Sequence, residues 1–156
     1  MALSVPPLQY DMKSDGELEN LLCTKGLKVV ELYSEWCGPC KSVIPTFKRI
    51  RLDKEDESTL LFVTVCSEKC GFISEAEERR GKSEPFFLFY RNGSLKEKVP
   101  GSNTPRLSEL ILQLTPAMAD ADDIEENPLV QAKREREKKE REAAKEAARE
   151  AAKKRK

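Results

Sequence analysis

The chain has 156 residues, a length that predicts one ordinary domain with a further segment attached. Its opening stretch, MALSVPPLQYDMK, has no basic region followed by an apolar run, and the longest apolar run, TLLFVTVC, is far too short to span a bilayer. We therefore expect no secretory signal and no membrane partner. A soluble cytoplasmic chain lies in a reducing compartment, where a lasting structural disulfide is the less favoured use of cysteine.

Charge divides the chain into parts, although its 28 basic and 28 acidic side chains cancel overall. Residues 1–116 carry 16 bases and 17 acids, residues 117–130 carry five acids and no base, and residues 131–156 carry 12 bases and six acids. This pattern predicts a near-neutral folded domain over residues 1–116. It predicts an acidic linker followed by a basic tail over residues 117–156.

The first half of the domain alternates helix and strand. Residues 14–26 predict a helix in which Ser14 is the N-cap and Glu17 completes a capping box. Residues 27–34 predict a buried strand. The two cysteines that follow are expected to open a second helix, and Pro45 is expected to kink or break it because proline donates no helix hydrogen bond.

The second half of the domain continues with a strand and a short polar helix, and it closes with a hairpin and a last helix. We expect these elements at residues 58–66, 73–82, 85–101 and 103–115. The hairpin turns at Asn92-Gly93, and Thr104 is the expected N-cap of the last helix. This order predicts an α/β fold, with a central mixed β-sheet flanked by helices.

The basic tail is built of strong helix formers, and its only apolar side chains are alanines. The alanine stripe drifts by about 40° every four residues and lacks the Leu or Ile of a coiled-coil seam. Two interpretations stay open: a solvated, partly helical tail, or a basic helix that orders on an acidic partner. The lack of interleaved aromatic side chains argues against a nucleic-acid partner.

The stretch SEWCGPCKSVIP places Cys37 and Cys40 two residues apart in a chain without histidine. A structural zinc site needs four ligands, so it would have to recruit Cys66 and Cys70. The first pair, however, lies at a strand–helix junction and not in a knuckle rich in turn residues. A structural disulfide over so short a loop would remove little chain entropy. Disulfide exchange is the use that this pattern favours.

Disulfide exchange needs Cys37 as a thiolate near neutral pH, and a helix start would direct backbone N–H groups at its sulfur. Cys40 would then resolve a mixed disulfide, with Gly38 allowing close approach of a substrate and Pro39 restricting the turn. This resolution requires Cys40 to lose its proton. Glu31, on the preceding apolar strand, is either a buried carboxylate that accepts this proton or a solvated side chain at a sheet edge.

The segment VVELYSEWCGPCKSVIP resembles the active-site segment of the thioredoxin family, with an acid in the strand, WCGPCK, and a proline five residues after the second cysteine. The resemblance continues, since Ala76 stands nine residues before Pro85, FFLFYRNG is similar to the family's edge strand and turn, and Gly101 matches its late glycine. It covers about residues 10–116 and implies the thioredoxin fold.

By this resemblance Cys37 is the nucleophile, Cys40 is the resolving thiol and Glu31 is a candidate proton acceptor. The substrates are then protein thiols and disulfides, and no cofactor or metal is implied. The resemblance also implies a cis peptide bond before Pro85, which would present a strand edge to an extended peptide. The implied substrate groove consists of Trp36, Gly38, Pro39, Glu84, Pro85 and Gly101.

Three departures from the family pattern bear on the site. Glu31 stands where the family usually has aspartate. Glu84 stands before Pro85, where the family has a small or apolar residue, and a carboxylate there disfavours thiolates and acidic substrates. Cys66 ends a strand where the family often has aspartate. Cys66 and Cys70 form either a second redox pair or two reduced, partly buried thiols.

A thioredoxin domain with altered groove residues and a charged extension resembles the thioredoxin-type light chains of the outer dynein arm in cilia and flagella. That resemblance implies a subunit docked on the axonemal motor, through the dynein heavy chain or another outer-arm subunit, which adds redox sensitivity. Two alternatives stay open: a redox-inert adaptor and a free cytosolic protein-disulfide reductase. The intact WCGPC favours a redox-active chain, whereas Glu84 and the tail favour the adaptor.

Overall fold

A computed structural model describes residues 4–122 and 125–155; the outermost residues of the opening stretch and of the tail, and Asp123 of the acidic linker, lie outside the described residues. The strands are β1 (Gln9–Met12), β2 (Leu27–Tyr33), β3 (Leu60–Cys66), β4 (Phe86–Arg91) and β5 (Ser94–Pro100). The helices are α1 (Asp15–Leu22), α2 (Ile44–Asp53), α3 (Ser74–Arg79), α4 (Thr104–Leu114), α5 (Ala119–Asp122) and α6 (Pro128–Lys154), and η1 (Ser67–Lys69) is a 3-10 turn.

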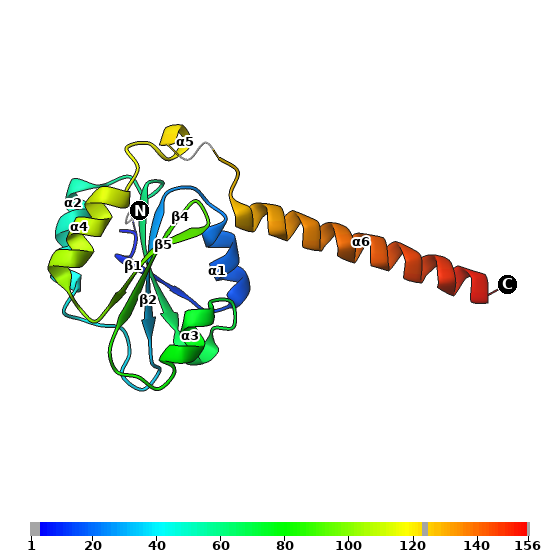
Figure 1. The fold of residues 1–156 in the computed structure, drawn as a ribbon, viewed down its shortest axis with the longest axis horizontal. Helices are drawn as coiled ribbons and strands as arrows, with labels where there is room; N and C mark the ends of the chain where they lie inside the picture. The colour runs from blue at the N-terminus through cyan, green and yellow to red at the C-terminus, as the bar shows by residue number, and fades with distance from the viewer. Residues whose placement is uncertain (1–3, 123–124, 156) are drawn as a thin grey trace.

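The strands form a mixed sheet in the order β1-β3-β2-β4-β5. β1 and β2 pair in parallel with β3, whereas β4 is antiparallel to both β2 and β5. Helices lie on both faces of this sheet (Figure 1), so the predicted fold class is confirmed. β1 was not among the expected elements, because its four residues carry no run of apolar side chains and are recognised only by their pairing with β3.

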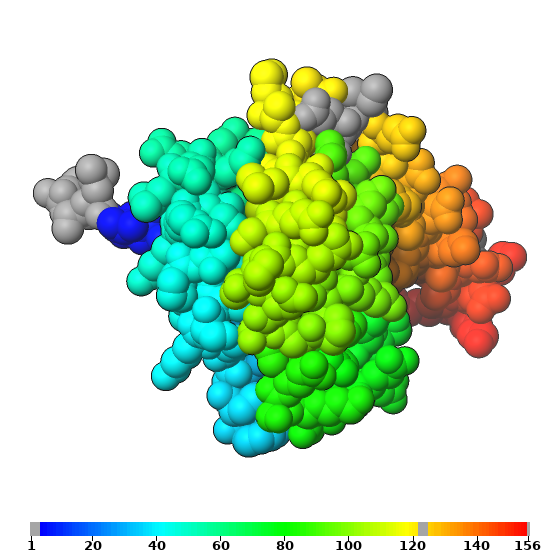
Figure 2. All heavy atoms as spheres, turned by 60° about the vertical axis from the view of Figure 1, so that its left-hand side comes forward, coloured from blue at the N-terminus to red at the C-terminus, as the bar shows by residue number. Residues whose placement is uncertain are grey.

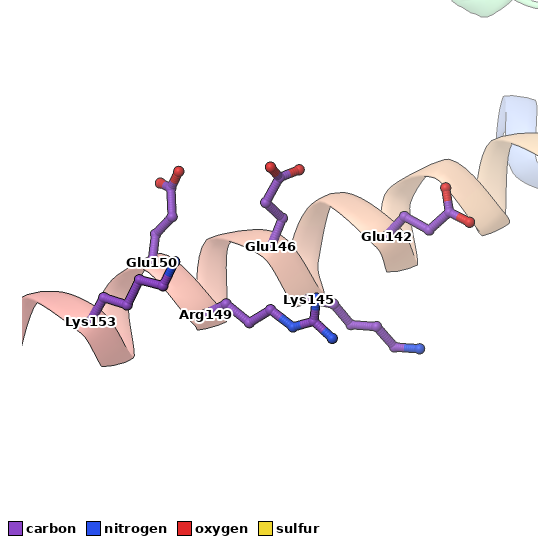
Figure 3. Close-up of a pocket in the computed structure, with 6 residues that line it drawn as sticks. All are labelled: Glu142, Lys145, Glu146, Arg149, Glu150 and Lys153. Atoms are coloured by element: carbon purple, nitrogen blue, oxygen red, sulfur yellow. The ribbon is translucent and has the colours of Figure 1, made fainter.

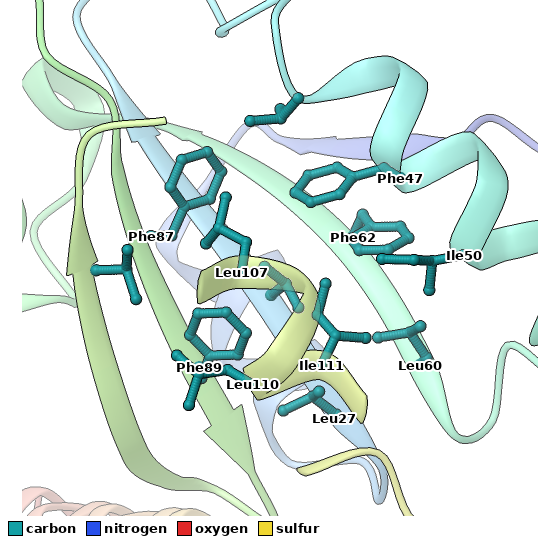
Figure 4. Close-up of a cluster of buried hydrophobic side chains, with 13 residues drawn as sticks. Leu27, Phe47, Ile50, Leu60, Phe62, Phe87, Phe89, Leu107, Leu110 and Ile111 are labelled. Atoms are coloured by element: carbon teal, nitrogen blue, oxygen red, sulfur yellow. The ribbon is translucent and has the colours of Figure 1, made fainter. Parts of the chain in front are cut away.

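The face of the sheet under α2 and α4 holds an aromatic core (Figure 4). Phe47 of α2 stacks on Phe62 of β3 with ring centroids 4.2 Å apart, and it meets Phe87 of β4 edge-on at 6.1 Å. Figure 2 shows α2 and α4 side by side over this face. These contacts fix α2, and therefore the segment that joins β2 to α2, against the sheet.

β2 is buried from both sides, because α1 and α3 cover the opposite face (Figure 1). Successive side chains of a strand point to opposite faces. Leu27 and Val29 belong to the core under α2 and α4, and Val30 and Leu32 belong to the core under α1 and α3. The same alternation places Glu31 on the α2 side of a central strand, so this acid lies inside the fold.

The start of α2 differs from the expected one. α2 begins at Ile44 and not at Cys37, and Pro45 lies in its first turn. A helix that began at Cys37 would hold Pro45 in its interior, where proline removes a hydrogen bond and clashes with the carbonyl four residues earlier. In the first turn the missing N–H costs nothing, because that group has no partner within the helix.

The N-caps of α1 and α4 follow simple side-chain chemistry. Ser14 caps α1 as predicted, since its hydroxyl accepts the N–H of Glu17 at 3.2 Å. In α4 the N-cap is Asn103 and not Thr104, because the Asn103 side chain accepts the N–H of Arg106 at 3.3 Å. Asparagine is a better N-cap than threonine, so the correction of one residue agrees with the known preference.

α6 forms where the tail was expected to be helical. It has 27 residues and no buried side chain, and it projects away from the domain (Figure 1). At 1.5 Å per residue its length is about 40 Å. Within the described residues, no helix is long and apolar enough to cross a membrane.

The outer part of α6, residues 137–154, is called the arm here. On the arm, acids and bases form two neighbouring lengthwise rows (Figure 3). The acidic row consists of Glu142, Glu146 and Glu150, and the basic row consists of Lys145, Arg149 and Lys153. Each base lies three residues after an acid, a spacing that supports an isolated helix. The arm therefore presents charge, and not an apolar seam, to its surroundings.

The root of α6, residues 125–136, is fixed to the domain through buried Asn127. The Oδ1 atom of Asn127 accepts the N–H of Leu129 at 2.9 Å as the N-cap of α6, while its Nδ2 donates to the carbonyl of Leu22 at the end of α1, also at 2.9 Å. A Cβ atom on Gly93 would collide with this amide, so the hairpin turn packs directly against Asn127.

Polar contacts extend the root along α1. Lys133 donates to Asn20 Oδ1 at 2.6 Å, and Arg136 pairs with Glu19 at 2.7 Å. Residues 125–130, which the sequence assigns to the linker, therefore belong to a segment that contacts the domain. The reason is that Asn127 and Leu129 find partners there, which the polar composition of the segment does not reveal.

β2 separates the root of α6 from the cysteines. Leu32 pairs with Phe86 at one end of β2, and Leu27 pairs with Arg91 at the other. The cysteines follow the first end, and the hairpin turn that contacts Asn127 lies at the second. β2 runs from Leu27 to Tyr33, so six residue steps of about 3.3 Å place its two ends about 20 Å apart, and α6 leaves the domain far from the dithiol.

We predict that Asn127→Ala loosens the root of α6. The substitution removes an N-cap worth about 1 kcal/mol and leaves the Leu22 carbonyl without its donor. Hydrogen exchange of the first-turn amides of α6 should accelerate, while the β2 amides stay protected. The exposed Gln131→Ala variant is the control. Equal exchange in Asn127→Ala and Gln131→Ala would show that Asn127 does not hold the root.

Candidate functional site

The segment between β2 and α2 turns tightly around the carbonyl oxygen of Ser34. The backbone N–H groups of Cys37 and Gly38 donate to this oxygen at 3.2 and 3.0 Å. The Sγ atom of Cys37 lies 3.4 Å from the same oxygen, so the thiol also donates to it. Gly38 has a φ of 70°, a conformation that favours glycine. One carbonyl group therefore positions both the backbone and the thiol of Cys37.

The two cysteines of the turn differ in exposure. Cys37 is exposed, Cys40 is half-buried, and both are free thiols. The Cys40 sulfur lies 3.0 Å from the hydroxyl of Ser42. Because α2 begins at Ile44, the N–H groups beside Cys37 belong to the turn and not to the helix start that the sequence predicted. The arrangement presents Cys37 to solvent and keeps Cys40 behind it.

Glu31 is a buried acid directly behind Cys40. Its side chain is 1% exposed, its Oε1 accepts the backbone N–H of Cys40 at 2.5 Å, and its Oε2 accepts the Gln9 amide at 3.3 Å. The alternative of a solvated glutamate at a sheet edge is wrong, because β2 is a central strand covered on both faces.

The environment of Glu31 sets its protonation. Burial raises the pKa of Glu31 to about 7, although the donors from Cys40 and Gln9 act to lower it. A carboxyl group with a pKa near the working pH can accept and release a proton with little driving force lost in either direction. Glu31 can therefore exchange a proton with a neighbouring group at neutral pH.

The surface beside Cys37 is open. Trp36 is 68% exposed, and Pro39 is exposed as well. A Cβ atom built on Gly38 would meet no other atom within 4 Å. Three of the predicted groove residues thus surround an accessible thiol, with a large apolar ring on one side that an extended substrate chain can contact.

The structure brings Glu84, Pro85 and Gly101 together at the start of β4. The N–H of Gly101 donates to the Pro85 carbonyl at 2.7 Å, and a Cβ on Gly101 would lie 3.2 Å from Glu84 Oε1. The hydroxyl of Ser34 donates to the Lys82 carbonyl at 2.5 Å, which ties this segment to the cysteine turn. The peptide bond before Pro85 is trans, so the expected cis bond is wrong here; the trans form is intrinsically favoured even before proline.

Glu84 does not present an isolated negative charge. Its carboxylate pairs with the guanidinium of Arg79 at 3.2 Å, and the same guanidinium lies over the Phe86 ring, 4.3 Å from its centroid. From the sequence alone, this carboxylate is expected to disfavour thiolates and acidic substrates. Pairing with Arg79 reduces the repulsion that this acid would exert on a thiolate or an acidic substrate.

Cys66 and Cys70 are buried free thiols on either side of η1. The Cys66 thiol donates to Glu68 Oε2 at 3.3 Å. Burial raises the pKa of Cys66, and the hydrogen bond to Glu68 adds to that effect. A raised pKa leaves less thiolate, so these contacts favour two reduced thiols over a second redox pair. Among the described residues, no cluster of cysteine and acidic side chains could hold a metal ion.

Sequence reasoning missed two side chains that modify the site. Gln9, which donates to Glu31, belongs to the unexpected strand β1. Arg79, which neutralises Glu84, ends α3, and its position five residues before Glu84 was the one available signal. A spacing of five residues across a helix end does not predict contact, because the contact depends on how the chain turns after α3.

The sheet is mixed and has helices on both faces. The WCGPC turn follows a central strand and lies above a buried acid. Together these features define a thioredoxin-type dithiol domain. The Thioredoxin family model matches residues 11–113. The chain belongs to the thioredoxin family.

The chain is also similar to flagellar outer-arm light chains, as the sequence predicted. It is 63% identical over 138 residues to the dynein 16 kDa light chain of the flagellar outer arm of Chlamydomonas reinhardtii, and the match covers 88% of each chain. The dynein 14 kDa light chain of the same organism is 40% identical over 57% of this chain and 66% of its own length. Human thioredoxin domain-containing protein 6 is 38% identical over 67% of this chain, which spans 31% of that protein.

Solved thioredoxins share the fold. Plasmodium falciparum thioredoxin matches with a TM-score of 0.52 and 28% identity, over 67% of this chain and 97% of its own. Thioredoxin NaTrxh from Nicotiana alata matches with a TM-score of 0.55 and 21% identity, over 74% of this chain and 100% of its own. Both matches leave part of this chain outside the common fold.

The raised pKa of Glu31 predicts how stability depends on pH. Between the ordinary value of 4.5 and about 7, the folded state binds a proton that the unfolded state has lost, so stability falls as pH rises through this window. The loss reaches about 3 kcal/mol above pH 7. Glu31→Gln should remove this slope, as measured by urea unfolding between pH 4.5 and 8. If the free energy of unfolding depended on pH in the same way in the variant and the parent, the burial of Glu31 would not be the cause of its raised pKa.

Proposed function

We propose that this chain is a dithiol–disulfide exchange subunit of the outer dynein arm, carried on the axoneme of a cilium or flagellum. In this proposal residues 1–116 perform the exchange, and residues 117–156 take part in docking. The observation that supports disulfide exchange is the hydrogen bond between the buried Glu31 carboxylate and the Cys40 amide, behind an exposed Cys37. The 63% identity to a flagellar outer-arm light chain supports the location on the axoneme.

The exchange proceeds in two steps. The Cys37 thiolate attacks one sulfur of a protein disulfide, forms a mixed disulfide and releases the other substrate sulfur as a thiolate, which takes up a proton. The Cys40 thiolate then attacks Cys37 Sγ and releases the second substrate thiol. Two electrons pass from the dithiol to the substrate, and a Cys37–Cys40 disulfide remains. An external dithiol reductant returns it to the reduced form.

Glu31 serves the second step. Cys40 must lose its proton before it attacks, and Glu31 contacts the Cys40 backbone from inside the fold. With a pKa of about 7, Glu31 is partly ionised at neutral pH and can accept this proton. Glu31 does not contact Cys37, whose thiol donates to Ser34, so the first attack does not need it.

The groove residues recognise an extended substrate chain. Exposed Trp36 and Pro39 offer apolar contact next to Cys37, and Pro85 lies at the start of β4, close to the cysteine turn. The Arg79–Glu84 pair adds one charge of each sign to this edge. We infer a preference for protein disulfides whose flanking residues are apolar or of mixed charge over strongly acidic ones.

Docking is assigned to the arm of α6. The arm projects from the end of the domain opposite the cysteines, so a partner can hold it while Cys37 stays accessible (Figure 1). Its apolar side chains are alanines, which bury little area, so the association is mainly electrostatic. The dynein heavy chain or another outer-arm subunit with an acidic surface is the proposed partner.

A redox-inert adaptor is the second candidate function. The observation in its favour is the arm, which can dock a partner whatever the state of the cysteines. An adaptor would bind the outer arm equally well when Cys37 and Cys40 are both replaced by serine, and it would show no exchange activity. The activity test below separates the two functions.

The exchange function predicts distinct defects for three substitutions. Cys37→Ser should abolish reduction of insulin disulfides. Cys40→Ser should permit the first attack and stop at a mixed disulfide. Glu31→Gln should leave the first attack unchanged and slow the release of the mixed disulfide about a hundredfold, the usual contribution of a general base. Stopped-flow reduction of a fluorescent disulfide resolves the two steps. A parent chain without activity would favour the adaptor.

The docking function predicts a salt-sensitive arm. A chain that ends at Glu137 keeps the root of α6 and loses most of the arm, so its reduction of insulin should match that of the parent. Its co-sedimentation with isolated outer arms should weaken at low salt. The parent should also be released near 1 M salt, where the Debye length is about 3 Å. Undiminished binding of the shortened chain would move the docking surface to the folded domain.

A further inference from the structure

Glu68 in η1 contacts three backbone and side-chain donors, although its side chain is exposed. Its Oε2 accepts the N–H of Glu35 at 3.0 Å and the thiol of Cys66 at 3.3 Å, and its Oε1 accepts the N–H of Gly81 at 3.3 Å. Exposed acids normally bind water, so three protein donors on one carboxylate indicate a built contact.

The Glu35 N–H belongs to the same peptide unit as the Ser34 carbonyl. This carbonyl accepts the thiol of Cys37 and the N–H groups of Cys37 and Gly38. Because a peptide unit is planar, an acceptor fixed on its N–H side also fixes the direction of its carbonyl. Glu68 therefore orients the group on which the cysteine turn is built, although it does not touch either cysteine of the turn.

The chain of hydrogen bonds is also polarised. Partial burial acts to raise the pKa of Glu68, but the N–H groups and the Cys66 thiol outweigh it and hold this pKa below its usual range, so Glu68 is ionised at neutral pH. A carboxylate on the N–H of a peptide strengthens its carbonyl as an acceptor, because successive hydrogen bonds polarise one another. The Ser34 carbonyl is then a stronger acceptor for the N–H groups of Cys37 and Gly38.

The same residue joins the neighbouring segments. Gly81 lies on the connection from α3 to Pro85, so Glu68 links the groove edge to the cysteine turn. Arg80 completes this link, since its guanidinium donates to the carbonyls of Ser67 and Cys70 at 3.2 and 3.3 Å. The cysteine turn, η1 and the groove edge are therefore one connected unit, with Glu68 at its centre.

We propose that Glu68 is a positioning residue for Cys37, which acts through the Ser34–Glu35 peptide to hold the backbone of the cysteine turn in the conformation that directs the Cys37 sulfur at a protein disulfide. This role rests on the exchange function proposed above. It assigns a task to an acid outside the WCGPC motif, and it explains why the carboxylate of η1 faces the cysteine turn.

The role predicts that Glu68→Ala changes one of two rates. Alkylation of Cys37 by iodoacetamide at pH 7, in a Cys40→Ser chain, should stay within about twofold of the parent, because a small reagent does not need an oriented sulfur. Reduction of insulin by the chain with both cysteines should become about fivefold slower, because a large substrate requires an oriented thiol and a small reagent does not.

Two further variants complete the test. Glu68→Gln keeps an oxygen for the Glu35 N–H and should stay close to the parent in both rates. Lys69→Ala removes the 3.3 Å ion pair of Lys69 with Glu35 but leaves the Glu68 contact, and it should leave both rates unchanged. Urea unfolding confirms that each variant is folded at the assay pH.

Three outcomes would overturn the role of Glu68: unchanged reduction of insulin by folded Glu68→Ala, a parallel fall of both rates, or a Glu68→Gln defect as large as that of Glu68→Ala. Failure of the exchange function has a different signature. A parent that does not reduce insulin refutes exchange, whereas hydrogen exchange of the Cys37 and Gly38 amides in the parent and the three variants still decides whether Glu68 positions the cysteine turn.

Discussion

The hydrogen bond from the Cys40 amide to the buried Glu31 carboxylate is the interaction on which the rest of the site depends. It joins the central strand to the dithiol turn, and it exists only because the alternation of β2 turns Glu31 toward α2. Burying an acid there is costly, as its pKa of about 7 indicates. The aromatic core around Phe47 secures α2 and keeps the turn over Glu31.

The proposed exchange site and the proposed docking arm lie at opposite ends of the sheet. The dithiol turn and Pro85 lie at one end of β2, and the hairpin turn and Asn127 lie at the other. Asn127 closes the end of α1 and opens α6 with one side chain, so the arm leaves the domain in a fixed direction. A partner bound to the arm would therefore leave the Cys37 thiol uncovered, as the proposed docking on a motor requires.

The sequence predicted what depends on local pattern and left out what depends on distant contacts. Strand–helix alternation and WCGPC were enough to predict the mixed sheet and the dithiol turn. The sequence predicts a helix that opens at the cysteines and is kinked or broken at Pro45, whereas α2 begins at Ile44 and holds Pro45 in its first turn. Gln9, Arg79 and Glu68 act through contacts between segments far apart in sequence or across a loop, and no periodicity reports such contacts.

A trapping experiment decides whether this chain exchanges disulfides on the outer dynein arm. Full-length Cys40→Ser chain is bound to outer arms isolated from axonemes, and a Cys37→Ser, Cys40→Ser chain is bound in parallel. We expect a reducible adduct between Cys37 and an outer-arm subunit with the first chain and none with the second. Equal binding of both chains with no reducible adduct from either would contradict exchange and leave a redox-inert adaptor.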